Sequence, residues 1–422
     1  MIALVDCNNF YASCERVFRP DWEQQPIAVL SNNDGCVIAR SNEAKPLVNM
    51  GMPLFKIPAH VQRQLVLVSS NYALYGDMSR RVTDTLREFT PEVDLYSIDE
   101  SFLSFNGFPL ADLKERCHRL RYVVKRNTGI PVSVGLSTSP TLAKIANRLA
   151  KSHPHSQGVC VLMPNSDTTR RILSALPIRD VWGVSNRLAQ RFEQANIYTA
   201  WQLRESDPKH IRRLFSVVQE RLVLELQGTH CISLEEHDTT RHHIMTSRSF
   251  GQLTGSLDEL RHAIRAHAAR GAEKLRRQGS VAHAVQVHLH THRHRTDLPQ
   301  YSPVQVVQLP HPTHDTRQLV QAAQRALSHI WRPGYRFMKA GVMMLDLIDA
   351  ARAPLDLLDD VHYDNRQRHA TLDKLMDELN RKMGRGTVRL GDTHSKAAWK
   401  LKADRLTPRY TTRWDELPIA RL

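Results

Sequence analysis

The sequence predicts a multidomain α+β protein, and three observations support this prediction. Strand-like and helix-like stretches alternate over about the first 165 of the 422 residues. A wholly helical stretch follows, from about residue 166 to residue 235. The elements after it follow the order β-α-β-β-α-β, which is typical of a small sheet with two helices on one face. We therefore expect an α/β region, a helical region and a small sheet domain, in that order.

The α/β region begins with the apolar strand MIALVDC, the helix FYASCERVF and the strand PIAVLSN, which ends at the turn NNDG. Residues 37–45 are predicted to be helical up to Pro46, and the next helix is YALYGDMSRRVTDTLREF. EVDLYSIDESFLSF predicts a hairpin-like pair of strands. An amphipathic helix ending at Gly129, the strand PVSVGLS and the helix SPTLAKIANRLAKS complete this region.

The helical region contains two helices around a glycine turn, within LPIRDVWGVSNRLAQRFEQANI, and a further helix that ends at a glycine. The polar stretch EEHDTTRHH resembles a linker to the sheet domain. About seventy residues at the C-terminal end have weak periodicity and many charges, so no fold is predicted for them.

Composition favours a polyanionic partner. The formal net charge is +15 and the pI is about 9.8, as expected for a protein that binds nucleic acid. No apolar run is long enough to span a membrane, so we expect no membrane association. The six cysteines form no CxxC pair and the first residues lack a secretory pattern, which together favour a reducing cytoplasm.

Three carboxylates are the strongest candidates for chemistry. Asp6 ends the first strand, and Asp99 and Glu100 lie in the predicted hairpin. If these strands are neighbours, the three groups converge at one sheet edge, where oxygen ligands suit Mg²⁺ and phosphoryl transfer by two ions. The alternative is a surface hairpin whose charges only keep it soluble. Lys45, Lys144 and Lys151 lie beside predicted helix surfaces and suit either triphosphate oxygens or solvent.

Several long motifs, in order, resemble the UmuC branch of the Y-family DNA polymerases. They are ALVDCNNFYASCE, VLSNNDGCVIARSNEAK, SSNYALYGDMS, YSIDESF, VGLSTSPTLAKIANRLAK, VWGVSNRLAQRF, SRSFG and LTPRYTTRW. The resemblance covers essentially the whole chain. It implies a right-hand polymerase and error-prone translesion synthesis in the SOS response to DNA damage. The implied domains are a palm (1–25 and 79–165), fingers (26–78), a helix-hairpin-helix-like thumb (166–235), a little finger (242–350) and a C-terminal extension (351–422).

The resemblance also assigns residues to the active site. Asp6, Asp99 and Glu100 match the catalytic carboxylates that bind two Mg²⁺ ions, and Cys7 matches a position whose backbone carbonyl completes one metal shell. Tyr11 matches the steric gate that excludes a ribose 2′-OH, although a core aromatic is the alternative. The positions implied to bind the incoming triphosphate are Phe10, Asn42, Lys45 and Lys151.

Further positions concern DNA and partner proteins. In the thumb motif, Gly183 and Ser185 flank Val184, with serine where a second glycine is usual. The other DNA-binding positions are Arg248, Arg293 and Arg295. The nearby histidines, four of which alternate along a predicted strand, suit either a transition metal or a polar face along DNA. They are His283, His288, His290, His292 and His294.

APLDLLDD resembles a sliding-clamp peptide with Leu355, Leu357 and Leu358 as its apolar contacts, and an ordinary loop is the alternative. The implied partners are primer-template DNA, dNTP, processed UmuD-type subunits, a RecA filament and the sliding clamp. Two other functions are compatible with this fold. One is a catalytically silent DNA-binding scaffold, against which the three intact carboxylates argue. The other is a palm enzyme that joins or cyclises free nucleotides, against which the basic thumb and little finger argue.

Overall fold

The computed structural model describes residues 1–232, 241–354, 363–384, 386–391 and 401–417. The chain divides into two compact units. The first unit comprises Met1–Ser31, Gly35–Asp238 and Arg405–Leu422. The second unit comprises Asn32–Asp34 and Thr239–Asp404.

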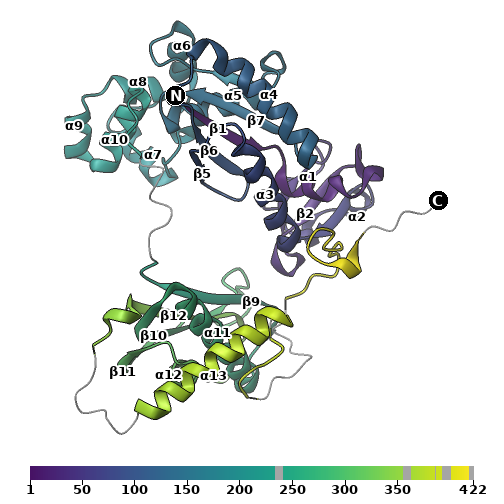
Figure 1. Cartoon of the computed structure of the whole chain (residues 1–422), viewed down its shortest axis with the longest axis vertical. Helices are drawn as coiled ribbons and strands as arrows, with labels where there is room; N and C mark the ends of the chain where they lie inside the picture. The colour runs from purple at the N-terminus through teal and green to yellow at the C-terminus, as the bar shows by residue number, and fades with distance from the viewer. Residues whose placement is uncertain (233–240, 355–362, 385, 392–400, 418–422) are drawn as a thin grey trace. The chain divides into compact units, whose positions relative to one another are not determined.

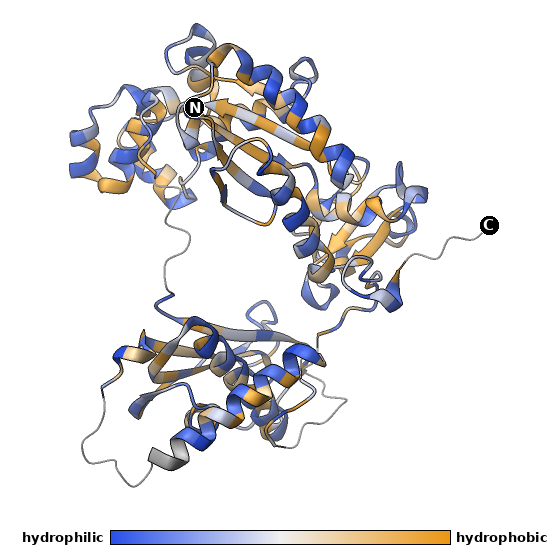
Figure 2. Ribbon diagram, viewed as in Figure 1, coloured by the Kyte–Doolittle hydropathy of each residue, from blue (hydrophilic) through white to orange (hydrophobic). Residues whose placement is uncertain are grey.

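A five-stranded sheet forms the centre of the first unit, with the strand order β5-β6-β1-β7-β8 (Figure 1). Its strands are β1 (Ile2–Cys7), β5 (Val93–Leu95), β6 (Glu100–Ser104), β7 (Val132–Ser137) and β8 (Val159–Val161). β1 is antiparallel to both β6 and β7, and every residue of β1 and β7 is buried. These two strands are largely hydrophobic in Figure 2, as expected for strands covered on both faces. The predicted hairpin-like pair β5–β6 is confirmed.

Four helices pack with this sheet and build its hydrophobic core. They are α1 (Phe10–Val17), α3 (Tyr72–Leu86), α4 (Leu110–Thr128) and α5 (Pro140–Ser152). α4 ends where predicted, because Gly129 takes the left-handed conformation that closes a helix at low cost. Ser139 caps α5 by accepting a hydrogen bond from the Leu142 amide. The helix α5 follows β7 directly, so its start is fixed relative to the sheet.

A three-stranded sheet, in the order β3-β2-β4, forms a second part of the first unit. Its strands are β2 (Ile27–Leu30), β3 (Val37–Arg40) and β4 (Val66–Ser69), and the short helix α2 (Ala59–Gln62) precedes β4. The predicted helix at 37–45 is wrong. Val37, Ala39 and Arg40 pair antiparallel with β2, so pairing in the sheet overrides the helical pattern of this short stretch.

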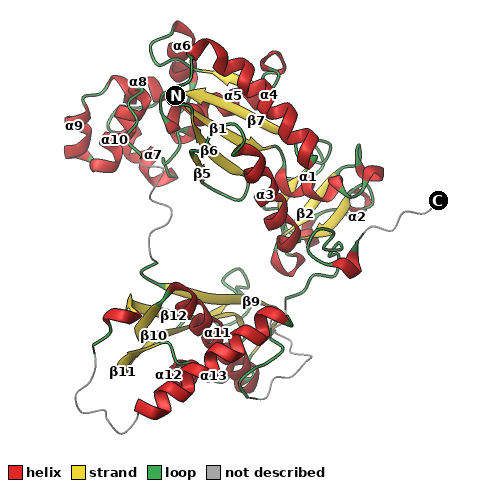
Figure 3. Ribbon diagram, viewed as in Figure 1, coloured by secondary structure: helices red, strands yellow, loops and turns green. Residues whose placement is uncertain are grey.

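The expected helical region also belongs to the first unit (Figure 3). Its helices are α6 (Asp167–Ala175), α7 (Asn186–Gln194), α8 (Ala200–Glu205), α9 (Pro208–Leu214) and α10 (Val217–Gln227). They share a core with α5, to which Leu142, Ile145 and Ala146 contribute. The helix α5 therefore connects the five-stranded sheet to the helical region. The predicted linker lies mostly at 233–240, outside the described residues.

The second unit contains the predicted β-α-β-β-α-β order, which is confirmed. The elements are β9 (Ile244–Thr254), α11 (Leu257–Gln278), β10 (Ser280–Thr291), β11 (Val304–Thr313), α12 (Thr316–Ile330) and β12 (Phe337–Asp349). The sheet order is β11-β10-β12-β9, antiparallel throughout. Buried and exposed residues alternate along β9 and half-buried and exposed ones along β11, as expected where one sheet face packs on helices.

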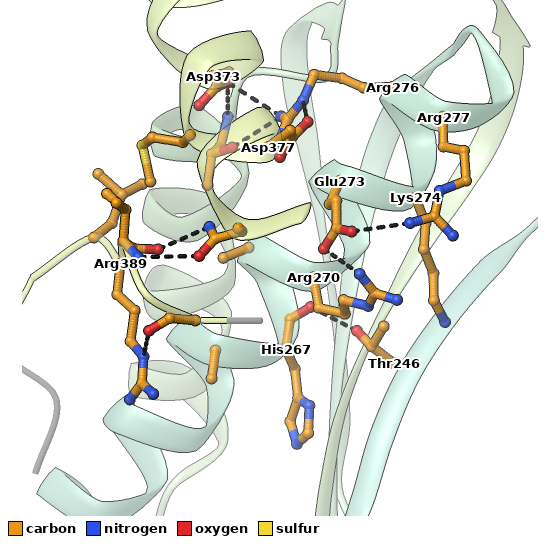
Figure 4. Close-up of a pocket in the computed structure, with 18 of the residues that line it drawn as sticks. Thr246, His267, Arg270, Glu273, Lys274, Arg276, Arg277, Asp373, Asp377 and Arg389 are labelled. Atoms are coloured by element: carbon orange, nitrogen blue, oxygen red, sulfur yellow. Dashed lines mark hydrogen bonds and ion pairs between the residues drawn. The ribbon is translucent and has the colours of Figure 1, made fainter. Parts of the chain in front are cut away.

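A further helix, α13 (Tyr363–Lys382), lies in the stretch for which no fold was predicted. Arg276 of α11 holds it: its guanidinium donates to both carboxylate oxygens of Asp377, at 2.7 and 2.8 Å, and to Asp373 at 3.1 Å (Figure 4). These ion pairs border an open cavity of about 1550 Å³ between α11, α13 and β9. On another part of the wall, Glu273 pairs with Arg270 and Arg277 (Figure 4).

The C-terminal segment, defined as residues 405–417, belongs to the first unit although α13 belongs to the second. The Ser69 amide donates to the Arg405 carbonyl at 3.0 Å, and the Arg405 amide donates to the Ser69 hydroxyl at 3.0 Å. Tyr410 is 8% exposed and joins the main core of this unit. None of the helices in the described part of the chain combines the length and apolar character needed to cross a membrane.

Candidate active site

The ends of β1 and β6 bring the predicted carboxylates together on neighbouring strands. Asp6 lies directly opposite Glu100 in the antiparallel register. The amide of Cys7 donates to the carbonyl of Asp99 at 2.9 Å, so the residue before Glu100 is also fixed against β1. The condition for convergence, that these strands are neighbours, is therefore met. The Cys7 side chain is buried, which leaves its backbone as the part of the residue that can serve the site.

Each carboxylate has a partner of its own. Lys151 Nζ lies 2.6 Å from Asp6 Oδ2, and Lys144 Nζ lies 2.9 Å from Glu100 Oε1. Both lysines come from α5. The Ser97 hydroxyl donates to Asp99 Oδ1 at 2.7 Å. Lys144 also lies over the rings of Tyr96 and Trp182, at 4.6 and 5.2 Å from their centroids. The aromatic rings hold this ammonium against Glu100 by cation–π attraction.

The electrostatics indicate a site that is short of positive charge. Burial raises the pKa of Asp6 to about 6, and the negative charges of Glu100 and Asp99 add to this rise against the opposing effect of Lys151. Within the described residues, no three acidic, histidine or cysteine side chains form a group that could hold a metal ion. The three carboxylates instead contact Lys151, Lys144 and Ser97. The donor chemistry itself fits Mg²⁺: three carboxylates and a backbone carbonyl supply only oxygen.

An open cavity of about 540 Å³ borders these groups. Asp6, Glu100, Lys144 and Lys151 line it together with Trp182 of the helical region. Asn147 fixes α5 beneath it, since its side-chain amide donates to the carbonyls of Leu4 at 3.2 Å and Ser133 at 2.8 Å. Because Leu4 lies in β1 and Ser133 in β7, these hydrogen bonds tie both strands to α5, the helix that carries the two lysines.

The predicted steric gate lies on α1 in a cluster of tyrosines. The Tyr11 ring stacks on Tyr75 with a centroid separation of 4.4 Å and an interplanar angle of 15°, and it meets Tyr72 edge-on at 6.0 Å. Tyr11 is half-buried, so part of its ring remains accessible. Phe10, by contrast, is only 3% exposed and belongs to the core. Any contact of Phe10 with a triphosphate would have to come from its backbone.

Asn42, Lys45 and Lys151, the other residues predicted to bind the triphosphate, also lie near one another. Asn42 Oδ1 accepts hydrogen bonds from Asn9 at 3.1 Å and from Lys45 Nζ at 2.7 Å. Asn9 immediately precedes α1, which links this turn to the helix that carries Tyr11. Burial lowers the pKa of Lys45, and the positive charges of Arg40 and Lys151 lower it further. Lys45 and Lys151 are therefore near enough to repel each other. Such repulsion is expected between two cations that bind the same polyanion.

Two positions of the predicted thumb turn, Gly183 and Ser185, are ones where glycine is usual, but only one of them has a backbone conformation that favours glycine. Gly183 has a φ of +82°, which favours glycine. Ser185 is extended, with a φ of −76°, so serine in place of a second glycine causes no strain. Its hydroxyl instead caps α7 by accepting from the Leu188 amide at 3.3 Å.

The predicted DNA-contacting arginines of the second unit differ in their surroundings. Arg248 is exposed on β9 and lines the larger cavity. Arg293 is exposed and donates to the ring of His294. Arg295 forms a bidentate pair with Asp297, at 2.7 and 2.6 Å, so DNA would have to compete with that carboxylate.

The histidine pattern does not continue along one strand face, because β10 ends at Thr291. His288 is buried, and burial lowers its pKa to about 4; its ring lies 5.2 Å from that of His290. His292 and His294 lie beyond the strand, and His283 lies at a β-bulge. The predicted clamp-contacting leucines, at 355, 357 and 358, lie outside the described residues.

Three side chains of this site have roles that no local sequence pattern indicates. Lys144, predicted beside a helix surface, pairs with Glu100, and Tyr75 and Asn147 support the site although no role was predicted for them. Tyr75 and Asn147 lie within the motifs SSNYALYGDMS and VGLSTSPTLAKIANRLAK, so the signal was their position in a motif rather than any local pattern.

Family models and relatives match most of the chain. The impB/mucB/samB family matches residues 5–148, its C-terminal domain matches residues 241–357, and a domain of unknown function matches residues 370–420. Protein ImpB of Salmonella typhimurium is 42% identical over 100% of both chains. Protein UmuC of Salmonella typhimurium strain LT2 is 42% identical over 99% of both.

A solved structure shares the fold. A Y-family DNA polymerase chimera of Dbh and Dpo4 matches with a TM-score of 0.64 and 19% identity, over 82% of this chain and 99% of that one. At this identity the likeness shows the architecture, which agrees with the predicted multidomain α+β polymerase fold. With the family matches and the two relatives of full length, it leads to one assignment. The chain belongs to the impB/mucB/samB family, in the UmuC branch of the Y-family DNA polymerases.

Proposed function

We propose that this chain is an error-prone translesion DNA polymerase of SOS mutagenesis, which adds dNTPs to a primer 3′-OH opposite damaged template bases. The observation that carries the proposal is the register of β1 and β6, which sets Asp6 opposite Glu100 with Asp99 beside them. Family membership and the lysine-lined cavity support the same function.

Asp6, Asp99, Glu100 and the Cys7 carbonyl would hold two Mg²⁺ ions. When bound, such ions stabilise the attacking and leaving oxygens of a phosphoryl displacement. The adjacency of Asp6, Asp99 and Glu100 supports this assignment, because a divalent cation would neutralise their gathered negative charge.

The chain's own side chains bind and select the nucleotide. Lys45 and Lys151 would hold triphosphate oxygens by charge, and Asn42 orients Lys45 through its hydrogen bond. Tyr11, packed flat on Tyr75, presents an aromatic edge that would exclude a ribose 2′-OH while admitting deoxyribose. These residues come from α1, α5 and the turn after β3, so the site is assembled from the whole α/β region.

The basic charge of the chain supports binding to primer-template DNA without sequence preference. The helix N-terminus of α7 beside Gly183, together with the exposed Arg248 and Arg293, supplies phosphate-binding groups. Processed UmuD-type subunits, a RecA filament and the sliding clamp complete the proposed partners.

Primer extension opposite an abasic site tests the proposal, using the full chain with its accessory subunits and RecA. The variant is Asp99→Ala plus Glu100→Ala, and the matched control is Glu92→Ala, an exposed acid that precedes β5. We expect no extension from the double variant and normal extension from the control. Extension that survives the double change would overturn the catalytic assignment.

Measuring the DNA affinity of the same proteins distinguishes a polymerase from a catalytically silent DNA-binding scaffold. If the double variant binds primer-template DNA as tightly as the wild type yet cannot extend it, the carboxylates serve chemistry. If wild-type protein binds DNA but never extends a primer under any of these conditions, the scaffold function replaces the polymerase.

A further inference from the structure

The proposed gate, Tyr11, owes its position to Tyr75. The two rings stack at 4.4 Å and 15°, and Tyr75 itself is completely buried on α3. Tyr72, one turn before Tyr75 on the same helix, closes the cluster from the edge. A shift of Tyr75 would therefore move the surface on which the gate ring rests.

A buried carboxyl group anchors Tyr75. Its hydroxyl donates to Glu15 Oε1 at 2.7 Å, and Glu15 is fully buried. Glu15 lies four residues after Tyr11 on α1, so both side chains project from the same helix face. Tyr75 thus contacts α1 twice, through its ring at Tyr11 and through its hydroxyl at Glu15. A buried carboxyl group is costly, and the proposed metal and triphosphate sites do not use this one.

The C-terminal segment contacts the start of α3, the helix that carries Tyr75. The Asn71 side-chain amide donates to the carbonyl and the hydroxyl of Thr407, each at 3.0 Å, and to the carbonyl of Pro408 at 3.1 Å. The Asn71 carbonyl oxygen meanwhile caps α3 by accepting from the Leu74 amide at 3.3 Å. One buried asparagine therefore joins the start of the tyrosine-bearing helix to a segment 336 residues away.

An aromatic contact fixes the segment to α1 as well. Tyr410 stacks on Phe18, just past the end of α1, with a centroid separation of 4.8 Å and an angle of 15°. Trp414, four residues later in the same segment, is 90% exposed. Arg405, Thr407 and Tyr410 thus contact the rest of the first unit, whereas Trp414 is largely exposed.

We propose that Tyr75, which Glu15 anchors, is a positioning residue for the gate Tyr11, and that the C-terminal segment holds the helix of Tyr75 in place through Asn71. Sugar selection then depends on residues at the far end of the chain. This rests on the proposed function, in which Tyr11 excludes the 2′-OH. It also assigns a role to the end of the stretch at 370–420 that matches a domain of unknown function.

The test is the sugar-selectivity ratio, the kcat/KM for a dNTP divided by that for the matching rNTP, measured on undamaged primer-template DNA. Both values come from one preparation, so a loss of folded protein cancels in the ratio. The variants are Tyr75→Phe, Thr407→Val and Tyr410→Ala, with Trp414→Ala as the exposed aromatic control. Glu15→Gln retains an acceptor for the Tyr75 hydroxyl and serves as the conservative variant.

We expect Tyr75→Phe to lower the ratio by about fivefold or more, and Thr407→Val and Tyr410→Ala to lower it by about threefold. Glu15→Gln and Trp414→Ala should leave it within about twofold of the wild type. An unchanged ratio in Tyr75→Phe would overturn the positioning role, and unchanged ratios in Thr407→Val and Tyr410→Ala would overturn the role of the segment. Tyr11→Ala distinguishes failure of the positioning role from failure of the proposed gate. If Tyr11→Ala leaves the ratio unchanged, the gate assignment itself is wrong.

Discussion

Asp6 of β1 lies directly opposite Glu100 of β6, and each pairs with a lysine from the same helix, α5. Lys144 and Lys151 are seven residues apart, about two helical turns, so they project from one face of α5. The helix thereby compensates two strand-end carboxylates at once. The position of α5 over the sheet consequently sets the charge balance of the proposed active site.

Gly135→Ala should disturb this placement. A Cβ on Gly135 of β7 would lie 2.1 Å from the Asn147 amide nitrogen and 2.2 Å from the Ala143 carbonyl oxygen, both in the backbone of α5. Because backbone cannot rotate away, we expect a loss of about 3 kcal/mol in the free energy of unfolding, measured by urea denaturation. Gly76→Ala is the control: it lies in α3 with open space around it and should stabilise by up to about 1 kcal/mol. Equal stability of the two variants would contradict the close approach.

Lys151→Ala should weaken nucleotide binding. Removing one charge-assisted contact to the triphosphate is expected to raise the KM for dNTP by about tenfold in single-nucleotide incorporation. Lys114→Ala, on the exposed face of α4, is the matched control and should leave KM unchanged. A KM that is insensitive to Lys151 would remove it from the triphosphate site.

Glu15 should make the stability of the chain depend on pH. Burial raises its pKa to about 7 from an ordinary value near 4.5, against the opposing hydrogen bond from Tyr75. The other titratable groups that face it are Cys14 of α1 and Tyr410 of the C-terminal segment. The folded chain binds this proton more tightly than the unfolded chain, so the contribution is complete below about pH 4.5 and is lost as pH rises through 7.

Glu15→Gln cannot ionise and should lose this part of the pH dependence. Relative to the wild type, it should gain stability between pH 5 and pH 8, by an amount on the order of 3 kcal/mol. Thermal unfolding of both proteins at the two pH values measures the difference. Parallel pH profiles would show that Glu15 titrates normally.

Arg276→Ala should weaken the packing of α13 on α11 within the second unit. The change leaves Asp373, whose side chain is 2% exposed, without its cation, which is expected to cost about 3 kcal/mol locally. Hydrogen exchange of the α13 amides should accelerate, whereas those of β10 remain protected. Arg277→Ala, which removes a 69% exposed partner of Glu273, should change exchange by no more than about 0.5 kcal/mol. Equal exchange in the two variants would show that Arg276 does not hold the helix.

The sequence predicted what its local patterns encode. Periodicity gave the strands β1 and β7, the helices α4 and α5, and the β-α-β-β-α-β order of the second unit. It failed at β3, where four residues form a strand only because β2 lies beside them. It could not give the pairing of Lys144 with Glu100 or of Tyr75 with Glu15, because those partners are 44 and 60 residues apart. The docking of Thr407 on Asn71 joins residues 336 apart in a stretch with weak periodicity.

The most direct test of the account is the rate of single-dNTP incorporation by Asp6→Asn, a change that keeps the shape of the side chain and removes its charge. The measurement uses the full chain with its partners on an undamaged primer-template. If Asp6 acts with Asp99 and Glu100 in catalysis, the rate should fall by about 100-fold or more while DNA affinity stays within about twofold of the wild type. A rate within about threefold of the wild type would contradict the proposed active site.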